Sequence, residues 1–163
     1  MKNKINQLDK NGNKVGYWEK YYPDGKLSSK GNYENDKQVG YWEYYHFDGK
    51  LSSKGNYVDG KRLGYWELYY PNGKLWYKGN YENDKQVGYW EYYHFDGQLS
   101  SKGNFENDKL RSVSESKRVG NWEYYYDNGQ LSSKGNFENG EQVGNWEYYY
   151  SNGKLDSKKY HIR

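Results

Sequence analysis

The chain has 163 residues, a net charge of +3 and no cysteine, and its 23 Tyr and seven Trp make up most of a hydrophobic content of only 33%. Without cysteine there is neither a disulfide framework nor a thiolate zinc site, and because acidic and basic residues alternate without a basic block, we expect no nucleic-acid binding. No signal segment precedes the first repeat and no run is apolar enough to span a membrane, so we expect a cytoplasmic location without membrane contact.

Residues 1–15 form the first expected element. Ile5 and Leu8 precede an Asn11-Gly12 pair, and Val15 follows it, as at the end of the repeating unit that begins next. We therefore predict an N-terminal capping strand in this segment.

From Gly16 onward the chain consists of six copies of one unit. The copies open at Gly16, Gly40, Gly64, Gly88, Gly120 and Gly144, so that four steps are 24 residues long and one is 32. In each copy, two runs of strand-forming residues flank an Asp-Gly or Asn-Gly pair, the strongest short-range signal for a β-hairpin. Residues 16–155 are therefore predicted to be six hairpins of an all-β protein, joined into an elongated, twisted, single-layer antiparallel sheet.

The Asp48-Gly49 pair sets the register of the second hairpin if it forms a two-residue type I′ loop. The expected pairs are His46–Leu51, Tyr44–Ser53, Glu43–Lys54, Trp42–Gly55 and Gly40–Tyr57. In this register the ring of Trp42 lies over the bare backbone of Gly55, and Glu43 forms an ion pair with Lys54 across the hairpin.

Opposed residues share a face, so each hairpin has two different sides. We call the side of Trp42 and Tyr44 the packing face, and the side of Tyr41, Glu43 and Tyr45 the outer face. Simple counting places one apolar column on the outer face: Val39, Leu63, Val87, Val119 and Val143. Either a bulge precedes each opening glycine or the outer face is partly covered.

Two segments depart from the regular period. The long step contains a Ser-rich, charged insertion at about 109–116, which we predict to be a surface loop, with an ordered loop on a binding face as the alternative. Residues 156–163 are expected to form a C-terminal cap. In this cap Lys159 replaces the expected Gly, and its charge protects an open sheet edge.

The spacing G-x-W-E-x-Y-Y-x-x-G-x-L-x-x-x-G-x-Y resembles MORN repeats, in particular the longer bacterial variant of proteins classed as YwqK-type antitoxins. The resemblance covers about Val15 to Leu155. It implies an elongated antiparallel sheet of hairpins that binds proteins or, in some eukaryotic members, membranes. Because these units are one residue longer than the common form and richer in tyrosine, the lipid-binding role is not carried over.

Catalytic and metal sites are not expected. His46 and His94 occupy equivalent columns two repeats apart, about 19 Å at the strand spacing of a sheet, so they cannot share a metal ion. Each glutamate that follows a tryptophan has a lysine predicted opposite it, which is the pattern of structural charge pairing rather than of acid–base chemistry. We therefore predict no enzyme activity and no cofactor.

Candidate binding residues come from the aromatic content of the outer face. Trp76 replaces the Ser of other copies and is expected opposite Tyr69 and beside Glu91, which is the composition of a binding hot spot. A stripe of tyrosines is expected along the same face: Tyr45, Tyr69, Tyr93, Tyr125 and Tyr149. The alternative is that these rings only stabilise the sheet.

These residues favour a non-enzymatic repeat scaffold that binds a protein partner through an aromatic sheet face, with an antitoxin or immunity role as the finer prediction. Two other functions stay open: a carbohydrate- or choline-binding repeat protein, in which rings hold a sugar or a quaternary ammonium, and a purely structural spacer. A homodimer through sheet edges or packing faces also stays open.

Overall fold

The computed structural model describes residues 5–107 and 115–162 and shows one sheet of 13 antiparallel strands that follow one another in chain order. The strands are β1 (Gln7–Leu8), β2 (Lys14–Tyr21), β3 (Leu27–Glu34), β4 (Lys37–Tyr45), β5 (Leu51–Val58), β6 (Lys61–Tyr69), β7 (Leu75–Glu82), β8 (Lys85–Tyr93), β9 (Leu99–Asn107), β10 (Ser116–Tyr125), β11 (Leu131–Glu138), β12 (Glu141–Tyr149) and β13 (Leu155–His161). The all-β fold predicted from the repeats is confirmed.

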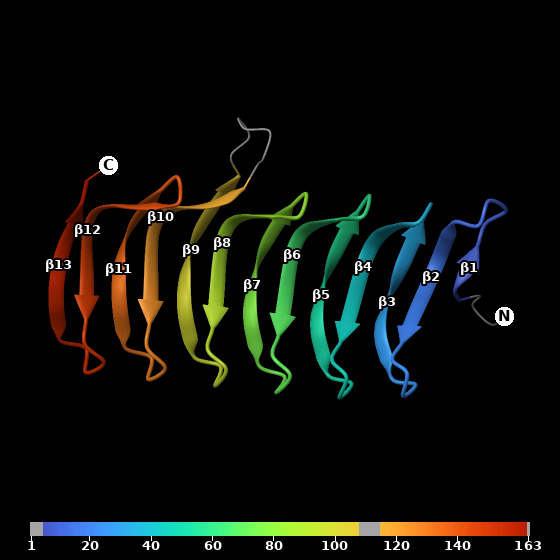
Figure 1. Cartoon of the computed structure of the whole chain (residues 1–163), viewed down its shortest axis with the longest axis horizontal. Helices are drawn as coiled ribbons and strands as arrows, with labels where there is room; N and C mark the ends of the chain where they lie inside the picture. The colour runs from blue at the N-terminus through green and yellow to red at the C-terminus, as the bar shows by residue number, and fades with distance from the viewer. Residues whose placement is uncertain (1–4, 108–114, 163) are drawn as a thin grey trace.

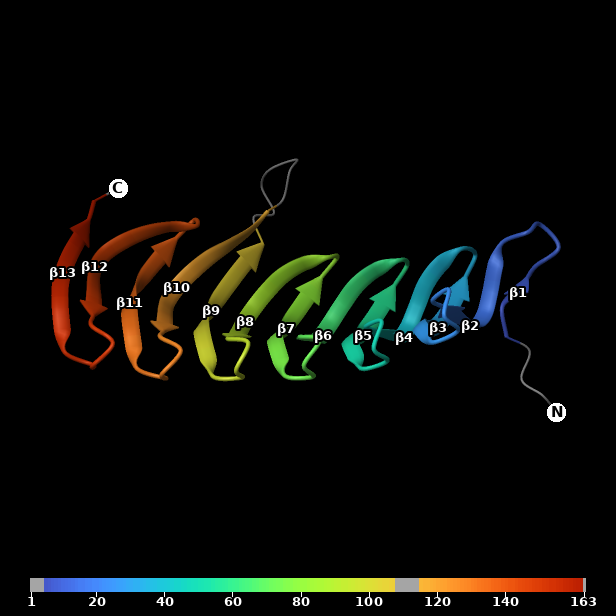
Figure 2. The same ribbon diagram turned by 60° about the horizontal axis from the view of Figure 1, so that its bottom comes forward.

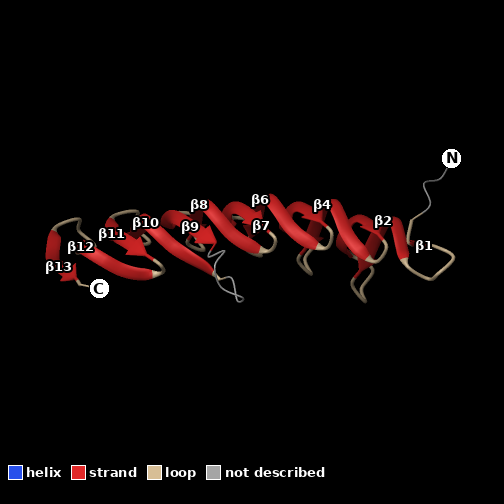
Figure 3. Cartoon of the chain, turned by 90° about the horizontal axis from the view of Figure 1, so that it is seen from above, coloured by secondary structure: helices blue, strands red, loops and turns tan. Residues whose placement is uncertain are grey.

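The sheet is a ribbon whose long axis runs across the strands. Figure 1 shows the strands side by side, with the hairpin loops along one long side and the turns between hairpins along the other. In the turned view of Figure 2 the strands cross the ribbon obliquely, as expected of a twisted sheet. Figure 3, seen from above, shows no second layer of secondary structure in the described part of the chain. No helix long and apolar enough to cross a membrane occurs in these residues.

The hairpin loops differ from the predicted two-residue form. In the second hairpin, the N–H of Gly49 donates to the carbonyl of His46 at 2.8 Å, and residues 47–49 form a three-residue loop. Gly49 takes the positive φ of this loop, at 87°. Tyr45 therefore faces Leu51, and the predicted pairing of His46 with Leu51 is wrong.

One extra residue in the second strand restores the predicted register beyond the loop. Ser52 has no Cα partner, because the pairing shifts by one residue between Tyr44 and Tyr45. The expected pairs from Tyr44–Ser53 outward are confirmed. The same shift recurs in the other five hairpins.

A second bulge lies next to the apolar column that counting places on the outer face. Val39 faces Asn32 and Glu43 faces Lys30, so that three residues of β4 stand against the single Gly31 of β3. The glycines that open the six repeats adopt φ values between 65° and 72° at this bend. The bulge therefore begins at the opening glycine rather than before it, and it leaves Val39 on the outer face, because Asn32 shares that face with Lys30.

Tryptophan rings fill the packing face. The five internal ones are at most 2% exposed: Trp42, Trp66, Trp90, Trp122 and Trp146. Each lies on a glycine of the preceding hairpin, since a Cβ added to Gly31 would be 2.2 Å from the ring of Trp42. The prediction that Trp42 covers its own Cα partner, Gly55, is wrong, because Gly55 lies under Trp66. These contacts join each repeat to the next.

A second column of rings separates the tryptophans. Its members are Tyr33, Tyr57, Tyr81, Phe105 and Phe137, which stand edge-on to the neighbouring indoles with centroids 4.9–6.3 Å apart. Edge-to-face geometry is favourable for aromatic pairs and lets a single layer bury its own rings. The thin aromatic core is what the composition indicates.

The hairpin loops are joined along their side of the ribbon by one column of polar side chains. The hydroxyl of Tyr70 donates to the carbonyl of Tyr93 at 2.8 Å, and Nε2 of His46 contacts the carbonyl of Tyr69 at 2.9 Å. The equivalent contacts are Tyr22 to Tyr45, His94 to Tyr125 and Tyr126 to Tyr149. Histidine and tyrosine therefore have the same role in this column.

Removing the hydroxyl of this contact should destabilise the sheet measurably. We expect Tyr70→Phe to lower the free energy of unfolding by about 1 kcal/mol, since a carbonyl that is partly buried loses its donor. The matched control is His46→Tyr, which exchanges one donor of the column for the other and should change the urea midpoint little. Equal midpoints for Tyr70→Phe and the unchanged chain would contradict the role of the contact.

Some predicted segments fall only partly within the described residues. Residues 109–114 of the insertion lie outside them, and β10 begins at Ser116. Residues 1–4 of the expected N-terminal strand and Arg163 of the expected cap also lie outside.

Candidate binding face

The outer face carries three rows of side chains that run along the ribbon. The first tyrosine row follows the opening glycines and consists of Tyr17, Tyr41, Tyr65 and Tyr89. The charged row contains the glutamate after each tryptophan and the lysines of the second strands. The second tyrosine row consists of Tyr45, Tyr69, Tyr93, Tyr125 and Tyr149.

The ion pairs of the charged row connect repeats. The ammonium of Lys30 lies 2.6 Å from the carboxylate of Glu43 in the next hairpin. The same contact recurs in Lys54–Glu67, Lys78–Glu91, Lys102–Glu123 and Lys134–Glu147, at 2.6–3.1 Å. Glu43 and Lys54 are Cα partners as predicted, but the predicted ion pair between them is wrong, because Lys54 contacts Glu67 instead.

The second tyrosine row is bonded to this charged row. The hydroxyl of Tyr45 donates to Glu43 at 2.6 Å, and Nζ of Lys30 lies 5.6 Å from the centre of the Tyr45 ring. Tyr69, Tyr93, Tyr125 and Tyr149 donate to the glutamate two residues earlier in the same way. Each repeat thus contributes to a lysine, glutamate and tyrosine group shared with its neighbour.

These contacts hold the charged row in its ionised form. Burial raises the pKa of Glu43, but hydrogen bonds from Lys30 and Tyr45 outweigh it and leave that pKa below its ordinary value. Hydrogen bonds to Glu43 and Tyr45 raise the pKa of Lys30. At the last repeat, hydrogen bonds from Lys158, then Tyr149 and Lys134, lower the pKa of Glu147 to about 2.

Acid should weaken the sheet through this row. A carboxyl whose pKa is lower in the folded than in the unfolded state contributes stability above its unfolded pKa, and that stability is lost as the pH falls through the folded value. For Glu147 the window runs from 4.5 down to about 2. We expect the urea midpoint to fall across this window, and to fall less in Glu147→Gln. A midpoint that stays constant from neutral pH to pH 2 would show that the row has no linkage to folding.

The first tyrosine row carries three half-exposed rings on the outer face. Tyr41, Tyr65 and Tyr89 are each 49% exposed, whereas the second tyrosine row is only partly exposed. The sequence reasoning placed Tyr41 on the outer face but did not select this row as a site. The signal in the sequence was its interruption, since Asn121 and Asn145 replace the tyrosine in the last two repeats.

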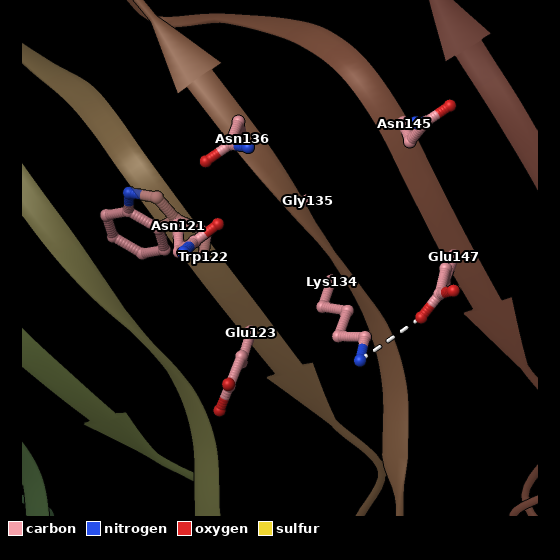
Figure 4. A pocket seen from close by; sticks show the side chains of 8 residues that line it. All are labelled: Asn121, Trp122, Glu123, Lys134, Gly135, Asn136, Asn145 and Glu147. Atoms are coloured by element: carbon pink, nitrogen blue, oxygen red, sulfur yellow. Dashed lines mark ion pairs between the residues drawn. The ribbon is translucent and has the colours of Figure 1, made fainter.

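That replacement opens a polar hollow of about 330 Å³ on β10, β11 and β12. Gly135 in its floor is partly exposed, whereas the equivalent glycines of the earlier repeats are buried. Figure 4 shows the amides of Asn136 and Asn145 above the Lys134–Glu147 ion pair. Within the described residues, no hydrogen bond is formed by the side-chain amides that line the hollow, those of Asn121, Asn136 and Asn145.

The repeats match a known family along most of the chain. The family model described as MORN repeat variant matches residues 14–35, 38–59, 62–83, 86–107, 118–139 and 142–162. The chain belongs to this MORN repeat family. No curated protein matches the chain with significant similarity.

Trp76, in the third MORN repeat, lies elsewhere than predicted. It occupies the bulge position of its hairpin, so Tyr69 faces Leu75 and not Trp76. Its ring, 44% exposed, packs against Tyr70 and Tyr77 at centroid distances of 5.5 and 4.8 Å. Its expected position opposite Tyr69 is therefore wrong, and Trp76 belongs to the loop side of the ribbon rather than to the tyrosine rows.

The same loop side carries two further exposed rings that sequence reasoning missed. Phe47 and Phe95 are 60% and 61% exposed at the first loop position of the second and fourth MORN repeats. Phe95 packs against Tyr70, so it adjoins the ring cluster of Trp76. Asp127 and Ser151 stand at this position in the last two repeats, so the loop side also changes from aromatic to polar along the chain.

The histidine side chains of the repeats make contacts between hairpins. The two histidines of the repeats each contact a backbone carbonyl of the next hairpin. The described residues contain no group of three or more His, Cys, Asp or Glu that could hold a metal ion. The arrangement offers aromatic rings and hydrogen-bonding groups on a rigid surface, which is suited to binding.

Proposed function

We propose that this MORN repeat protein is a non-enzymatic scaffold that binds a protein partner in the cytoplasm through the first tyrosine row of its outer face. The observation that carries the proposal is the row itself. Tyr41, Tyr65 and Tyr89 are half exposed and recur once per repeat, about 9.6 Å apart at the strand spacing of a sheet.

The physical argument is preorganisation. Tyrosine supplies large contact area with few rotatable bonds, and it is enriched in protein interfaces for that reason. The strands beneath the row are locked by the lysine, glutamate and tyrosine groups and by buried tryptophans. Little ordering cost is therefore incurred when a partner docks.

The finer proposal is that the partner is a toxin, which the ribbon neutralises by covering its surface. It is supported by the resemblance of these repeats to those of YwqK-type antitoxins. An antitoxin of this kind acts by steric occlusion, which requires a rigid surface and no chemical step.

The test compares the unchanged chain with the triple variant Tyr41→Ser, Tyr65→Ser and Tyr89→Ser as immobilised baits. We expect the triple variant to bind the captured partner at least about tenfold more weakly, since buried interface tyrosines are frequent hot spots. Tyr150→Ser is the matched control, because Tyr150 is also exposed but lies in a loop outside the row. Equal affinities of the triple variant and the unchanged chain would reject the row as the binding surface.

The antitoxin role has its own readout. The captured partner should arrest growth when it is expressed alone, and co-expression of the unchanged chain should restore growth while the triple variant should not. A partner that is harmless alone would reject the antitoxin role and leave the binding proposal standing.

Carbohydrate binding is the second candidate, and the polar hollow of the last two MORN repeats favours it. Amides with free donors and acceptors suit the hydroxyl groups of a sugar, which also both donate and accept. Retention on a glycan matrix that is lost in Asn121→Tyr, the residue of the earlier repeats, would support this function. A chain that passes through glycan and choline matrices unretained would reject it.

A further inference from the structure

The packing face contains a tyrosine that recurs in most repeats. It shows how an aromatic ring sits at this place of the repeat, and we use it as the template for the third repeat. In the second repeat Tyr44 stacks on Trp42, with ring centroids 5.8 Å apart and an interplanar angle of 25°. The equivalent pairs are Trp90–Tyr92, Trp122–Tyr124 and Trp146–Tyr148, with centroids 6.0–6.2 Å apart. Each of these four repeats therefore has a phenol ring on its packing face.

In two of these repeats the hydroxyl of this tyrosine accepts a hydrogen bond from a glutamine side chain. Nε2 of Gln38 donates to the hydroxyl of Tyr44 at 2.6 Å, and Nε2 of Gln86 donates to that of Tyr92 at 2.8 Å. In the second and fourth repeats the template is thus a flat ring whose hydroxyl meets a glutamine N–H from the start of the same hairpin. In the fifth repeat Arg118 has the position of the glutamine, and the buried hydroxyl of Tyr124 has no hydrogen-bond partner within the described residues.

The third repeat keeps the surroundings of this ring but lacks the ring. Leu68 stands in place of the tyrosine, and Arg62 stands in place of the glutamine. A hollow of about 250 Å³ is left there, lined by Tyr44, Ser53, Tyr57, Arg62, Trp66 and Leu68. Leu68 faces the small Ser53 on β5, so no large side chain stands directly opposite it on that strand.

The bulky residue on the other side does not fill the hollow. Tyr77 is the Cα partner of Leu68 on β7, where most repeats have Ser. Its ring packs toward the fourth repeat, 5.9 Å from the ring of Trp90 and 5.6 Å from that of Tyr92. The space over Leu68 is therefore left open.

We propose that this hollow receives the side chain of a tyrosine carried by a partner polypeptide. The guest ring would take the place that the tyrosine ring has in the other repeats, between Tyr44, Tyr57 and Leu68. Arg62 lines the hollow and would supply an N–H donor beside its hydroxyl. The hollow lies on the packing face, opposite the first tyrosine row, so the ribbon has a contact site on each side.

The shape of the hollow favours a side chain over a free phenol. Sites for small molecules enclose most of the ligand surface, whereas this hollow is open and Trp66 in its floor is only 2% exposed. A guest buries little more than one side of its ring here. Such a contact suffices for one residue of a larger interface, in which other contacts add to the binding energy.

The chemistry of Arg62 supports the orientation of the guest. Its Nε contacts Asp84 at 3.0 Å and its guanidinium carbon lies 3.9 Å from the centre of the Tyr81 ring, so the group is held in place. A guanidinium has five N–H donors, and contacts to one carboxylate leave others for a hydroxyl oxygen. A phenylalanine side chain would fill the hollow but would leave this donor unused.

The proposal rests on the proposed binding of a protein partner, but its test needs no partner. N-acetyl-tyrosinamide is titrated into the full chain labelled for NMR spectroscopy, with N-acetyl-leucinamide as the reference probe. We expect saturable shifts at the amides of Leu68, Tyr57 and Arg62 with the tyrosine probe at millimolar concentration, and weaker shifts with the leucine probe.

The decisive variant is Leu68→Tyr, which restores the residue of the sister repeats and so should fold. It is expected to abolish the shifts, because its own ring fills the hollow, whereas Arg62→Gln should retain them, since glutamine makes the same contact in the second and fourth repeats. The proposal is overturned if the tyrosine probe causes no localised shifts, or if the shifts persist in Leu68→Tyr. Partner capture by the first tyrosine row is unaffected by either result.

Discussion

Replacing Gly79 by alanine should cost about 3 kcal/mol of folding free energy, an unusually large effect for the addition of one methyl group. A Cβ at this position would lie 2.3 Å from the ring of Trp90, and Trp90 is 0% exposed. Because the rings of Tyr81 and Phe105 are in edge contact with the indole on its two sides, it has no free space to move into. Urea unfolding followed by near-ultraviolet circular dichroism measures the loss.

The chain contains its own control for this prediction. Lys159 stands in the same column but has no tryptophan over it in the described residues, so Lys159→Ala should change the free energy of unfolding by no more than about 0.5 kcal/mol. The double variant Gly79→Ala with Trp90→Ala should be no less stable than Trp90→Ala alone, since the clash is gone. Equal costs for Gly79→Ala and Lys159→Ala would mean that the ring contact does not couple the repeats.

The sequence predicts which residues face each other, but not toward which neighbour a side chain leans. The pairing of Trp42 with Gly55 and of Glu43 with Lys54 follows from the hairpin register, and both are found. Every strand inside the sheet has two neighbours, however, and both the ring and the charge contact the preceding hairpin. Lys159 was the signal in the sequence for this direction. It replaces the glycine of its column, and that glycine is dispensable only where no tryptophan of a following hairpin covers it.

The three-residue loop could also have been predicted from the sequence, from the prolines that precede the Asp-Gly or Asn-Gly pair in two copies. A type I′ loop needs positive φ at both residues, whereas Pro23 and Pro71 stand one residue before the pair in two copies. Proline fixes φ near −65° and suits the second position of a type I turn, which predicts the three-residue loop that is found. The error mattered only near the loop, where it misplaced Trp76.

The candidate sites were less predictable than the fold. Which face a tyrosine occupies follows from alternation, but how far it is exposed depends on contacts between repeats. Tyr45 is engaged by Glu43 and by Lys30 of the preceding hairpin, whereas Tyr41 of the same strand is left half exposed. Hollows arise where one repeat departs from the others, at Leu68 and at Asn121, and comparison of the copies is the way to find them.

A variant with both sheet edges altered should assemble end to end. The N-terminal edge is closed by Asn6, whose side-chain amide accepts from the backbone N–H of Glu19 at 2.8 Å and donates to its carbonyl at 3.1 Å. At the other edge, Lys158 turns back to Glu147 at 2.7 Å, whereas every other lysine of its row contacts the next glutamate along the chain. In the described residues Glu19 has no ion pair to a lysine. The two edges are therefore complementary in charge: Lys158 at one edge has no following glutamate, and Glu19 at the other has no lysine of a preceding hairpin.

Two blocks separate these edges in the unchanged chain. β1 and Asn6 occupy the backbone groups of β2, and the side chain of Lys159 stands where Trp18 of another copy would have to lie. We expect deletion of residues 1–8 together with Lys159→Gly to give concentration-dependent filaments, in which β2 of one copy pairs with β13 of the next and Lys158 contacts Glu19. A head-to-tail contact of this kind does not close on itself, so growth is open-ended.

The assembly requires both changes, which makes the outcome specific. The deletion alone leaves the Cβ of Lys159 in the path of the indole, and Lys159→Gly alone leaves the amide of Asn6 on the strand edge, so each single variant should sediment like the unchanged chain. Analytical ultracentrifugation over a range of concentrations and electron microscopy measure the result. A double variant that sediments like the unchanged chain would show that the fit between Lys158 and Glu19 does not overcome the entropy lost on association.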